Sequence, residues 1–163
     1  MIKAADVIAR LGLIPHCAEG GFFGETYRST RSAGQGRCCG TSIYYLLRGG
    51  DRSAWHRVTS DEIWYFHAGT PARQLVIEPD GNLRDVRIGP PGLPGALPQN
   101  VIPAGSWQSA LLLERGADDW GLFGAAVFPG FEYADFTAGS DDEVIALFPQ
   151  WAEVIRAFAA PQT

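Results

Sequence analysis

Hydrophobic and polar residues alternate over six stretches of the chain, and alternation with a period of two is typical of half-buried β-strands. The stretches are 19–30, 40–50, 53–69, 72–89, 100–113 and 120–130. Two of them, 53–69 and 72–89, each contain the pattern of two strands, and Asp80–Gly81 is a strong hairpin-turn signal in the second. We expect 31–39 to be a flexible connection and the proline- and glycine-rich 89–99 to be a surface loop.

The two ends of the chain change to the period of an α-helix. Apolar residues at helical spacing predict a helix over 3–11, which Gly12 would end. Near the other end, Ser140 is a candidate N-cap for a helix with an acidic first turn. Pro149 then divides the expected helical segment 140–160 into two pieces.

Eight or nine short strands with peripheral helices predict a mainly β fold, as a single barrel or a double-sheet jelly roll. The length suits one domain over 1–163, with the barrel core at about 19–137 and the C-terminal helices outside it. Such barrels enclose a pocket when side chains do not fill the interior. An aromatic content of 12% fits a ring-lined pocket and a well-packed core equally.

Charge and hydropathy exclude several classes of partner. The net charge of -5 and the scattered cationic residues argue against a nucleic-acid surface. No stretch approaches the ~20 apolar residues of a membrane span, and the N-terminus lacks the apolar run of a signal peptide. We therefore expect no membrane partner and a cytoplasmic location. Three cysteines, with Cys38 next to Cys39, make a poor disulfide framework and favour reduced thiols.

The stretch 53–69 contains a spacing that points to chemistry. From Gly50, five residues lead to His56, a single residue leads on to Val58, three more lead to Glu62, and six lead to Gly69. This resembles the first cupin motif, G-x5-H-x-H-x3/4-E-x6-G, with valine in place of the second histidine. Downstream, "PAGSWQ" is similar to the second motif, P-x-G-x2-H, with Gln108 in place of the histidine.

A closer resemblance extends over nearly the whole chain. It rests on the segments "EGGFFGETYRS", "TSIYYLL", "WHRVTSDEIWYFHAG", "VIPAGSWQ", "FPGFEYADF" and "LFPQWAEVIRAF", which are similar to the Cupin-5 family. The resemblance implies a cupin barrel that forms a homodimer, and it implies no particular reaction because the family is not defined by one. Relatives often read "HPEGG" where this chain has "HCAEGG", so His16 lies one residue further from Glu19. The strand around 21–29 is the edge that we expect to be exchanged or paired in the dimer.

A metal-binding cupin typically offers three histidines and one glutamate. The equivalent positions here hold His56, Val58, Glu62 and Gln108. Valine cannot coordinate and an amide oxygen is a weak ligand, so we expect no cofactor, with a divalent metal on His56, Glu62 and Gln108 as the alternative. His16 would add an imidazole if its loop folds over the mouth of the barrel.

Without a metal, the same positions suit acid/base chemistry. Strand alternation places His56 on an inward face, with Glu62 and Trp64 inward on the next strand and His67 on the opposite face. A nearby carboxylate raises the pKa of an imidazole and fixes its tautomer, which suits a general base or acid near neutral pH. His56 would be that group, Glu62 its orienting partner, and Gln108 a hydrogen-bonding group for a small-molecule ligand.

The sequence leaves three functions open. The first is a metal-independent isomerase, epimerase or lyase that acts on a small polar or sugar-like metabolite. Metal-free nucleotide-sugar 3,5-epimerases use a histidine base with a nearby tyrosine, and by fold analogy Tyr27 or Tyr44 could take that part. The second is a non-catalytic ligand-binding or sensor protein, and the third is a metal-dependent oxygenase or decarboxylase.

The aromatic side chains give a further set of candidates. Tyr44, Trp64 and Phe128 are candidate ligand-binding residues together with Tyr27 and Gln108. Aromatic rings fill a protein core more often than they line a ligand site, so core packing is the alternative for each of them. Similarly, His56 and Glu62 could simply satisfy one another in the interior.

Overall fold

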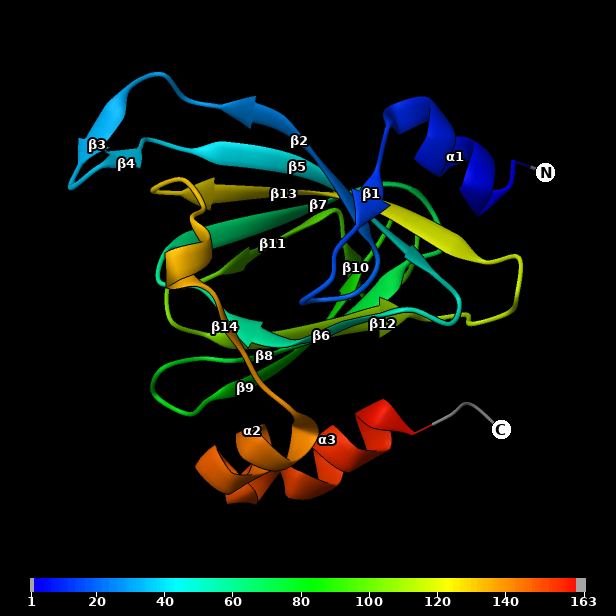
Figure 1. Ribbon diagram of the computed structural model, residues 1–163. Coiled ribbons are helices and arrows are strands. Elements are labelled where there is room, and N and C mark those ends of the chain that lie inside the picture. The colour runs from blue at the N-terminus through cyan, green and yellow to red at the C-terminus, as the bar shows by residue number, and fades with distance from the viewer. Residues whose placement is uncertain (1, 161–163) are drawn as a thin grey trace.

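The computed structural model describes residues 2–160 and shows two open, six-stranded sheets stacked face to face (Figure 1). The first sheet contains, in spatial order, β1 (Ile14–Pro15), β2 (Phe22–Arg28), β5 (Thr41–Arg48), β13 (Trp120–Phe128), β7 (Asp61–Gly69) and β11 (Gln99–Ile102). The second contains β10 (Ala96–Leu97), β9 (Leu83–Ile88), β8 (Ala72–Ile77), β12 (Trp107–Leu112), β6 (Arg52–Arg57) and β14 (Thr137–Ala138). The mainly β, jelly-roll architecture predicted from the alternating pattern is confirmed.

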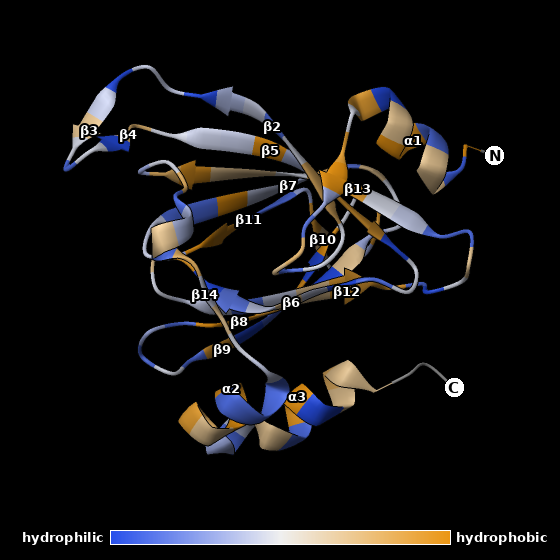
Figure 2. Ribbon diagram, in the orientation of Figure 1, coloured by the Kyte–Doolittle hydropathy of each residue, from blue (hydrophilic) through white to orange (hydrophobic). Residues whose placement is uncertain are grey.

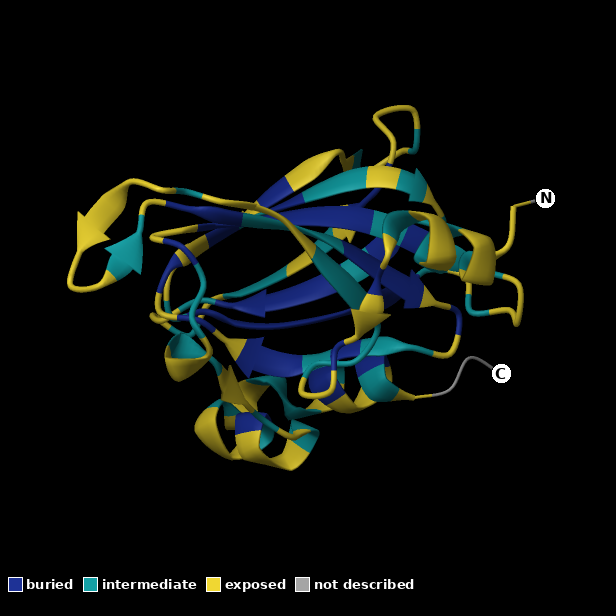
Figure 3. Ribbon diagram, turned by 45° about the horizontal axis from the view of Figure 1, so that its top comes forward, coloured by how far each residue is buried: buried dark blue, intermediate teal, exposed yellow. Residues whose placement is uncertain are grey.

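The space between the sheets is filled at one end by a hydrophobic core. Its fully buried members include Tyr45, Trp64 and Phe123, whose rings meet edge-on or tilted at centroid distances of 5.4 and 5.6 Å. Figure 3 shows the buried residues concentrated on the facing strands, while the loops are mostly exposed and the helices carry both exposed and buried residues. The other end of the interior is left for the cavity described below.

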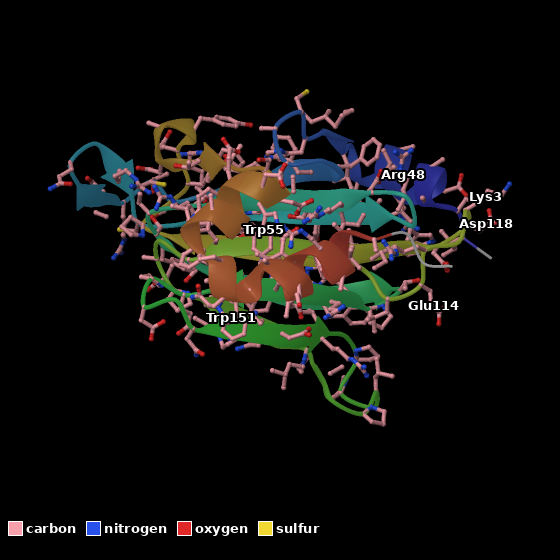
Figure 4. The ribbon with its side chains drawn as sticks, turned by 90° about the horizontal axis from the view of Figure 1, so that it is seen from below. Lys3, Arg48, Trp55, Glu114, Asp118 and Trp151 are labelled. Carbon is pink, nitrogen blue, oxygen red and sulfur yellow. The ribbon has the colours of Figure 1, made fainter. Side chains whose placement is uncertain are left out.

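A second hydrophobic cluster lies outside the sheets, beneath the C-terminal helices α2 (Asp141–Leu147) and α3 (Ala152–Ala159). Ile155 and Phe158 of α3 pack with Trp55 in this cluster. Figure 4 labels Trp55 beside the C-terminal helices. Figure 2 shows the mixed hydropathy of these helices, which is typical of elements with one buried face. The 3-10 turn η2 (Pro149–Trp151) joins them, so the predicted interruption at Pro149 is confirmed.

Two helix ends predicted from the sequence, the start of α2 at Ser140 and the end of the N-terminal helix at Gly12, are present in the structure. At α2, Ser140 Oγ accepts a hydrogen bond from the Glu143 N–H, and the Glu143 carboxylate accepts one from the Ser140 N–H. This reciprocal pair confirms Ser140 as the N-cap. The N-terminal helix α1 (Ala4–Leu11) ends at Gly12, which adopts a left-handed φ of 63°. None of the helices in residues 2–160 is both long and apolar enough to cross a membrane.

Two connections are more ordered than expected. Residues 31–39, expected to be a flexible connection, form a short hairpin of β3 (Ser32–Gly34) and β4 (Arg37–Cys38). Its turn has positive φ at Gln35 and at the glycines on either side of it, which is a pattern that polar composition alone does not distinguish from a disordered loop. Within 89–99, β10 pairs in parallel with β9. The structure also contains a short 3-10 turn, η1 (Tyr133–Asp135), between β13 and β14.

Candidate functional site

A cavity of about 120 Å³ opens between the sheets at the end opposite the main core. Its walls come from β2, β5, β6, β7 and β13, from the loop that joins β1 to β2, and from the segment 131–136. A volume slightly below the roughly 150 Å³ that holds a benzene molecule limits an enclosed ligand to a small metabolite. Both sequence candidates for chemistry, His56 and Glu62, line this cavity.

A β-bulge in β6 positions the imidazole of His56. The register of β6 against β12 shifts near Ala54, and the extra residue of a bulge is left out of the ladder. The Ala54 N–H donates to the Glu19 carbonyl, and the Ala54 carbonyl oxygen lies 2.8 Å from His56 Nδ1. A carbonyl only accepts, so Nδ1 of His56 carries a proton, and Nε2 of the neutral ring is an acceptor.

The loop before β2 brings a second imidazole, that of His16, into the same cavity. The Glu19 N–H donates to His16 Nδ1 over 3.0 Å, so the neutral ring of His16 carries its proton on Nε2. His16 is buried and its ring packs edge-on against Phe23 at a centroid distance of 4.8 Å. The two imidazoles in the cavity are therefore held in opposite tautomers by contacts with the backbone.

The carboxylate of Glu19 lies between these imidazoles. Its Oε2 atom is 3.9 Å from Nε2 of His16 and 3.9 Å from Nε2 of His56, while Oε1 accepts a hydrogen bond of 2.5 Å from Ser53. Gly20 follows with a φ of 95°, and a side chain there would meet the Arg52 carbonyl oxygen at 2.4 Å. Only glycine therefore allows the loop to approach β6 closely enough to insert Glu19.

Glu62 forms the deep wall on β7. Its Oε1 accepts from the Trp64 indole N–H over 2.8 Å, and its Oε2 accepts from the Gln108 amide N–H over 2.6 Å. Burial raises the pKa of Glu62 above its ordinary 4.5, and the charge of Glu19 raises it further. The two hydrogen bonds and a positive charge on His56 lower the same pKa and so oppose the shift.

An aromatic and charged segment covers the mouth of the cavity. Phe136 stacks on His56 with a centroid distance of 5.3 Å and an interplanar angle of 16°. Arg28 donates to Glu25 over 2.9 Å and to Glu132 over 2.8 Å, so it links β2 to the covering segment. Arg37 of the β3–β4 hairpin holds the same segment through the Gly130 carbonyl.

The donor set predicted for a metal does not fit one in this geometry. The Gln108 side chain donates its NH2 to Glu62 and accepts from Gln74 through its oxygen, so its only ligating atom faces away from Glu62. Val58 lines the cavity with hydrocarbon, and His16 Nε2 carries a proton. Among the described residues, no group of three or more His, Cys, Asp or Glu side chains is arranged to hold a metal ion.

Three of the candidate aromatic residues, Tyr27, Tyr44 and Phe128, lie outside the lining of this cavity. Tyr27 is 59% exposed and Phe128 is 47% exposed, and neither lines the cavity. A register shift between Glu25 and Tyr27 turns Tyr27 outward, which uninterrupted alternation would not predict. Tyr44 packs against His67 at a ring distance of 5.7 Å, away from the cavity lining.

Two further candidates act indirectly. Trp64 belongs to the hydrophobic core and contacts the site only through its hydrogen bond to Glu62. Gln108, on β12, likewise contacts the site through a hydrogen bond to Glu62. The residues that sequence reasoning missed are Glu19 and Phe136. For Glu19, the signal was the pair of glycines that follows it, because adjacent glycines mark a close approach of backbone to backbone. Phe136 had no local signal.

The comparisons with known proteins agree with this architecture. The family model described as "Cupin superfamily (DUF985)", Cupin_5, matches residues 5–139. An uncharacterised protein of Saccharomyces cerevisiae is 29% identical over 147 residues, which cover 80% of this chain and 73% of the yeast protein.

Solved structures extend the likeness. A protein of Shewanella oneidensis is 36% identical with a TM-score of 0.87, covering 99% of this chain and 100% of that one. A hypothetical protein from Leishmania major is 31% identical with a TM-score of 0.85, covering 98% and 100% of the two chains. Oxalate decarboxylase from Bacillus subtilis, at 16% identity and a TM-score of 0.58, covers 99% of this chain and 39% of its own, and it is similar in fold alone.

Proposed function

The chain belongs to the Cupin_5 family of the cupin superfamily, and we propose that it binds a small, neutral, hydroxyl-bearing metabolite and catalyses a metal-independent proton transfer of the isomerase or epimerase type. The observation that carries the proposal is the pair of opposite tautomers in one cavity. His56 presents an unprotonated Nε2, which can accept a proton, and His16 presents Nε2–H, which can donate a hydrogen bond.

Charge in the cavity favours a neutral ligand. The carboxyl groups of Glu19, Glu25, Glu62 and Glu132 line it, and Arg28 is its single Arg or Lys lining residue within the described chain. That guanidinium already donates to Glu25 and Glu132, so little positive charge is left to attract a carboxylate or phosphate group. Hydroxyl groups, in contrast, can donate to the carboxylates and accept from His16 Nε2–H.

The chemistry follows from the positions of the groups. His56 Nε2 would remove a proton from the carbon next to a ligand carbonyl, while His16 Nε2–H would donate a hydrogen bond to the oxygen that gains charge. The carboxylate of Glu19, 3.9 Å from His56 Nε2, would stabilise the imidazolium that forms. Return of the proton to another position or face of the carbon skeleton completes an isomerisation or epimerisation.

Deuterium incorporation tests the proposal without advance knowledge of the product. The protein is incubated in D2O with three- to six-carbon ketoses and aldoses and with the neutral fraction of a cell extract, and mass spectrometry follows the gain of deuterium at carbon. We expect catalytic incorporation into at least one compound, with a loss of roughly 100-fold or more in His56→Gln. His67→Gln is the matched control, because His67 lies outside the cavity lining.

The alternatives give different results in the same experiment. Equal incorporation by the wild-type protein and His56→Gln would contradict a role for His56 as the base. A ligand that raises the melting temperature without any exchange at carbon would favour the non-catalytic binding function instead.

A further inference from the structure

A row of buried amides connects the deep wall of the cavity with a guanidinium at the edge of the second sheet. Gln108 donates to Glu62 over 2.6 Å, Gln74 to Gln108 over 3.0 Å, and Asn100 to Gln74 over 2.8 Å. Arg84 Nη1 donates to Asn100 Oδ1 over 2.9 Å. The three amide side chains are at most 4% exposed. Gln108 and Gln74 lie on β12 and β8 of the second sheet, and Asn100 lies on β11 of the first.

The direction of every bond in this row is fixed by its charged end. A guanidinium has donors and no acceptor, so the oxygen of Asn100 must face Arg84 and its NH2 must face Gln74. The same reasoning then orients Gln74 and Gln108, because each amide that accepts on one side donates on the other. All four donors therefore point toward Glu62, and their dipoles add.

Arg84 is held firmly in this position. Its Nε donates to Glu78 over 2.7 Å and its Nη2 to the Val101 carbonyl over 2.7 Å. Arg84 lies on β9 and Asn100 on β11, so these bonds span the open edge between the two sheets. Fully satisfied buried networks fix one arrangement of an interior, whereas a single missing partner leaves a costly unpaired amide.

We propose that Arg84, Asn100, Gln74 and Gln108 form a positioning relay that orients Glu62 and supports its negative charge across the interior. Aligned hydrogen bonds in a low-dielectric interior polarise one another, so the charge on Arg84 strengthens the bond that Gln108 makes to the carboxylate. The charged and titratable groups that share the cavity with Glu62 come from four places: His56 from β6, His16 and Glu19 from the β1–β2 loop, Glu25 and Arg28 from β2, and Glu132 and Tyr133 from the segment that follows β13. Only the catalytic consequence rests on the proposed function, since the relay itself can be observed without a substrate.

The Trp64 indole N–H, which donates to Glu62 over 2.8 Å, is a spectroscopic reporter of that carboxylate. In proton–nitrogen correlation spectra, we expect Arg84→Met to move this resonance downfield, because the Trp64 N–H bond to Glu62 strengthens when the carboxylate loses the support of the relay, and a stronger hydrogen bond deshields its proton. Arg84→Lys, which keeps a positive group that only donates, should restore much of the shift. Arg73→Met is the matched control, because Arg73 pairs with Asp85 at the surface and takes no part in the relay.

The pH dependence separates a relay from simple packing. The midpoint at which the Trp64 resonance changes should move to higher pH in Arg84→Met and stay unchanged in Arg73→Met, since a carboxylate with less support binds its proton more readily. If exchange at carbon is observed, its rate should fall about tenfold in Arg84→Met, as for other partners that orient a functional group.

Identical spectra and midpoints for Arg84→Met and Arg73→Met would overturn the relay. If Arg84→Met does not fold, Arg84→Gln, which keeps a donor without the charge, carries the same comparison. A relay signal without exchange at carbon would refute the proposed function and leave the relay standing. If deuterium is incorporated at carbon at the same rate in Arg84→Met and the wild-type protein, and the Trp64 resonance does not move, the relay is refuted and the proposed function stands.

Discussion

The chemistry of this cavity is decided by which atom of each side chain the backbone already occupies. His56 gives Nδ1–H to a carbonyl and His16 accepts an N–H at Nδ1, so two chemically identical rings present different atoms to the cavity. Glu62 differs from the two histidines, because the side chains of Trp64 and Gln108, rather than the backbone, hold its oxygens, while burial raises its pKa. This combination has a measurable consequence for stability.

The free energy of unfolding should carry a pH-dependent contribution from Glu62. Because its pKa is higher in the folded than in the unfolded chain, the folded state binds more protons above pH 4.5, the ordinary value for glutamate. The contribution of Glu62 to stability should therefore decrease as pH rises from about 4.5 through the raised pKa. Urea unfolding between pH 3 and 8 should show that the free energy of unfolding of Glu62→Gln increases relative to that of the wild-type protein as pH rises above about 4.5.

Glu143→Gln gives the opposite sign as a control. The Ser140 hydrogen bonds lower the pKa of Glu143, so its contribution is present above pH 4.5 and is lost as pH falls through the lowered value. A constant difference in the free energy of unfolding between a variant and the wild-type protein carries no information about the pKa. The test is how that difference changes with pH. Parallel curves for Glu62→Gln and the wild-type protein would contradict the prediction.

Among the elements, the segment 129–137 forms one wall of the cavity, and Arg37 of the β3–β4 hairpin binds this segment. Arg37 donates to the Gly130 carbonyl over 2.6 Å, to Ser60 over 2.9 Å, and pairs with Asp135 over 2.8 Å. The hairpin therefore has a role in the site although none of its strands lines it.

Removing this anchor should loosen the covering segment. Hydrogen bonds from a charged donor contribute about 1.5–3 kcal/mol each, so we expect Arg37→Ala to increase backbone deuterium exchange in 129–137 by about tenfold or more. Arg31→Ala on the same connection is the control, because Arg31 is exposed. Unchanged exchange in Arg37→Ala would show that the Phe136–His56 stack and Arg28 suffice to hold the segment.

For the molecule as a whole, the outer face of the first sheet is an apolar surface. Tyr27 and Val101 on it are 59% and 48% exposed, and Ile14 at its edge is 58% exposed. Large apolar side chains exposed on one sheet face are candidates for an association surface. At the sheet edge, β1 pairs with only Phe22 and Phe23 of β2.

We therefore expect a homodimer, with twice the 17.6 kDa mass of the chain, by light scattering at micromolar concentration. Val101→Lys should shift the protein toward the monomer, because association would bury an unpaired charge. Arg87→Lys on the second sheet conserves the charge there and serves as the control. A wild-type monomer at micromolar concentration would contradict this assembly.

The predictions from sequence succeeded where structure depends on neighbouring residues. The helix ending at Gly12, the Ser140 cap and the strand pairs on either side of Asp80–Gly81 follow from local periods and turn residues, and the structure contains each of them. The motif spacing also identified His56 and Glu62 as members of the cavity. The outward position of Tyr27 was not predictable, because one bulged residue reverses the alternation that follows it.

The alternation that makes two facing sheets is readable from the chain alone, and so is the set of strands that could carry inward polar groups. The position of Glu19 between His16 and His56, the opposite tautomers of these histidines, and the direction of the Gln108 amide arise only from the folded arrangement. The difference lies in the range of the interactions. Periodicity records which side of an element is buried, whereas a proton's position and an amide's direction depend on partners that folding brings from distant parts of the chain.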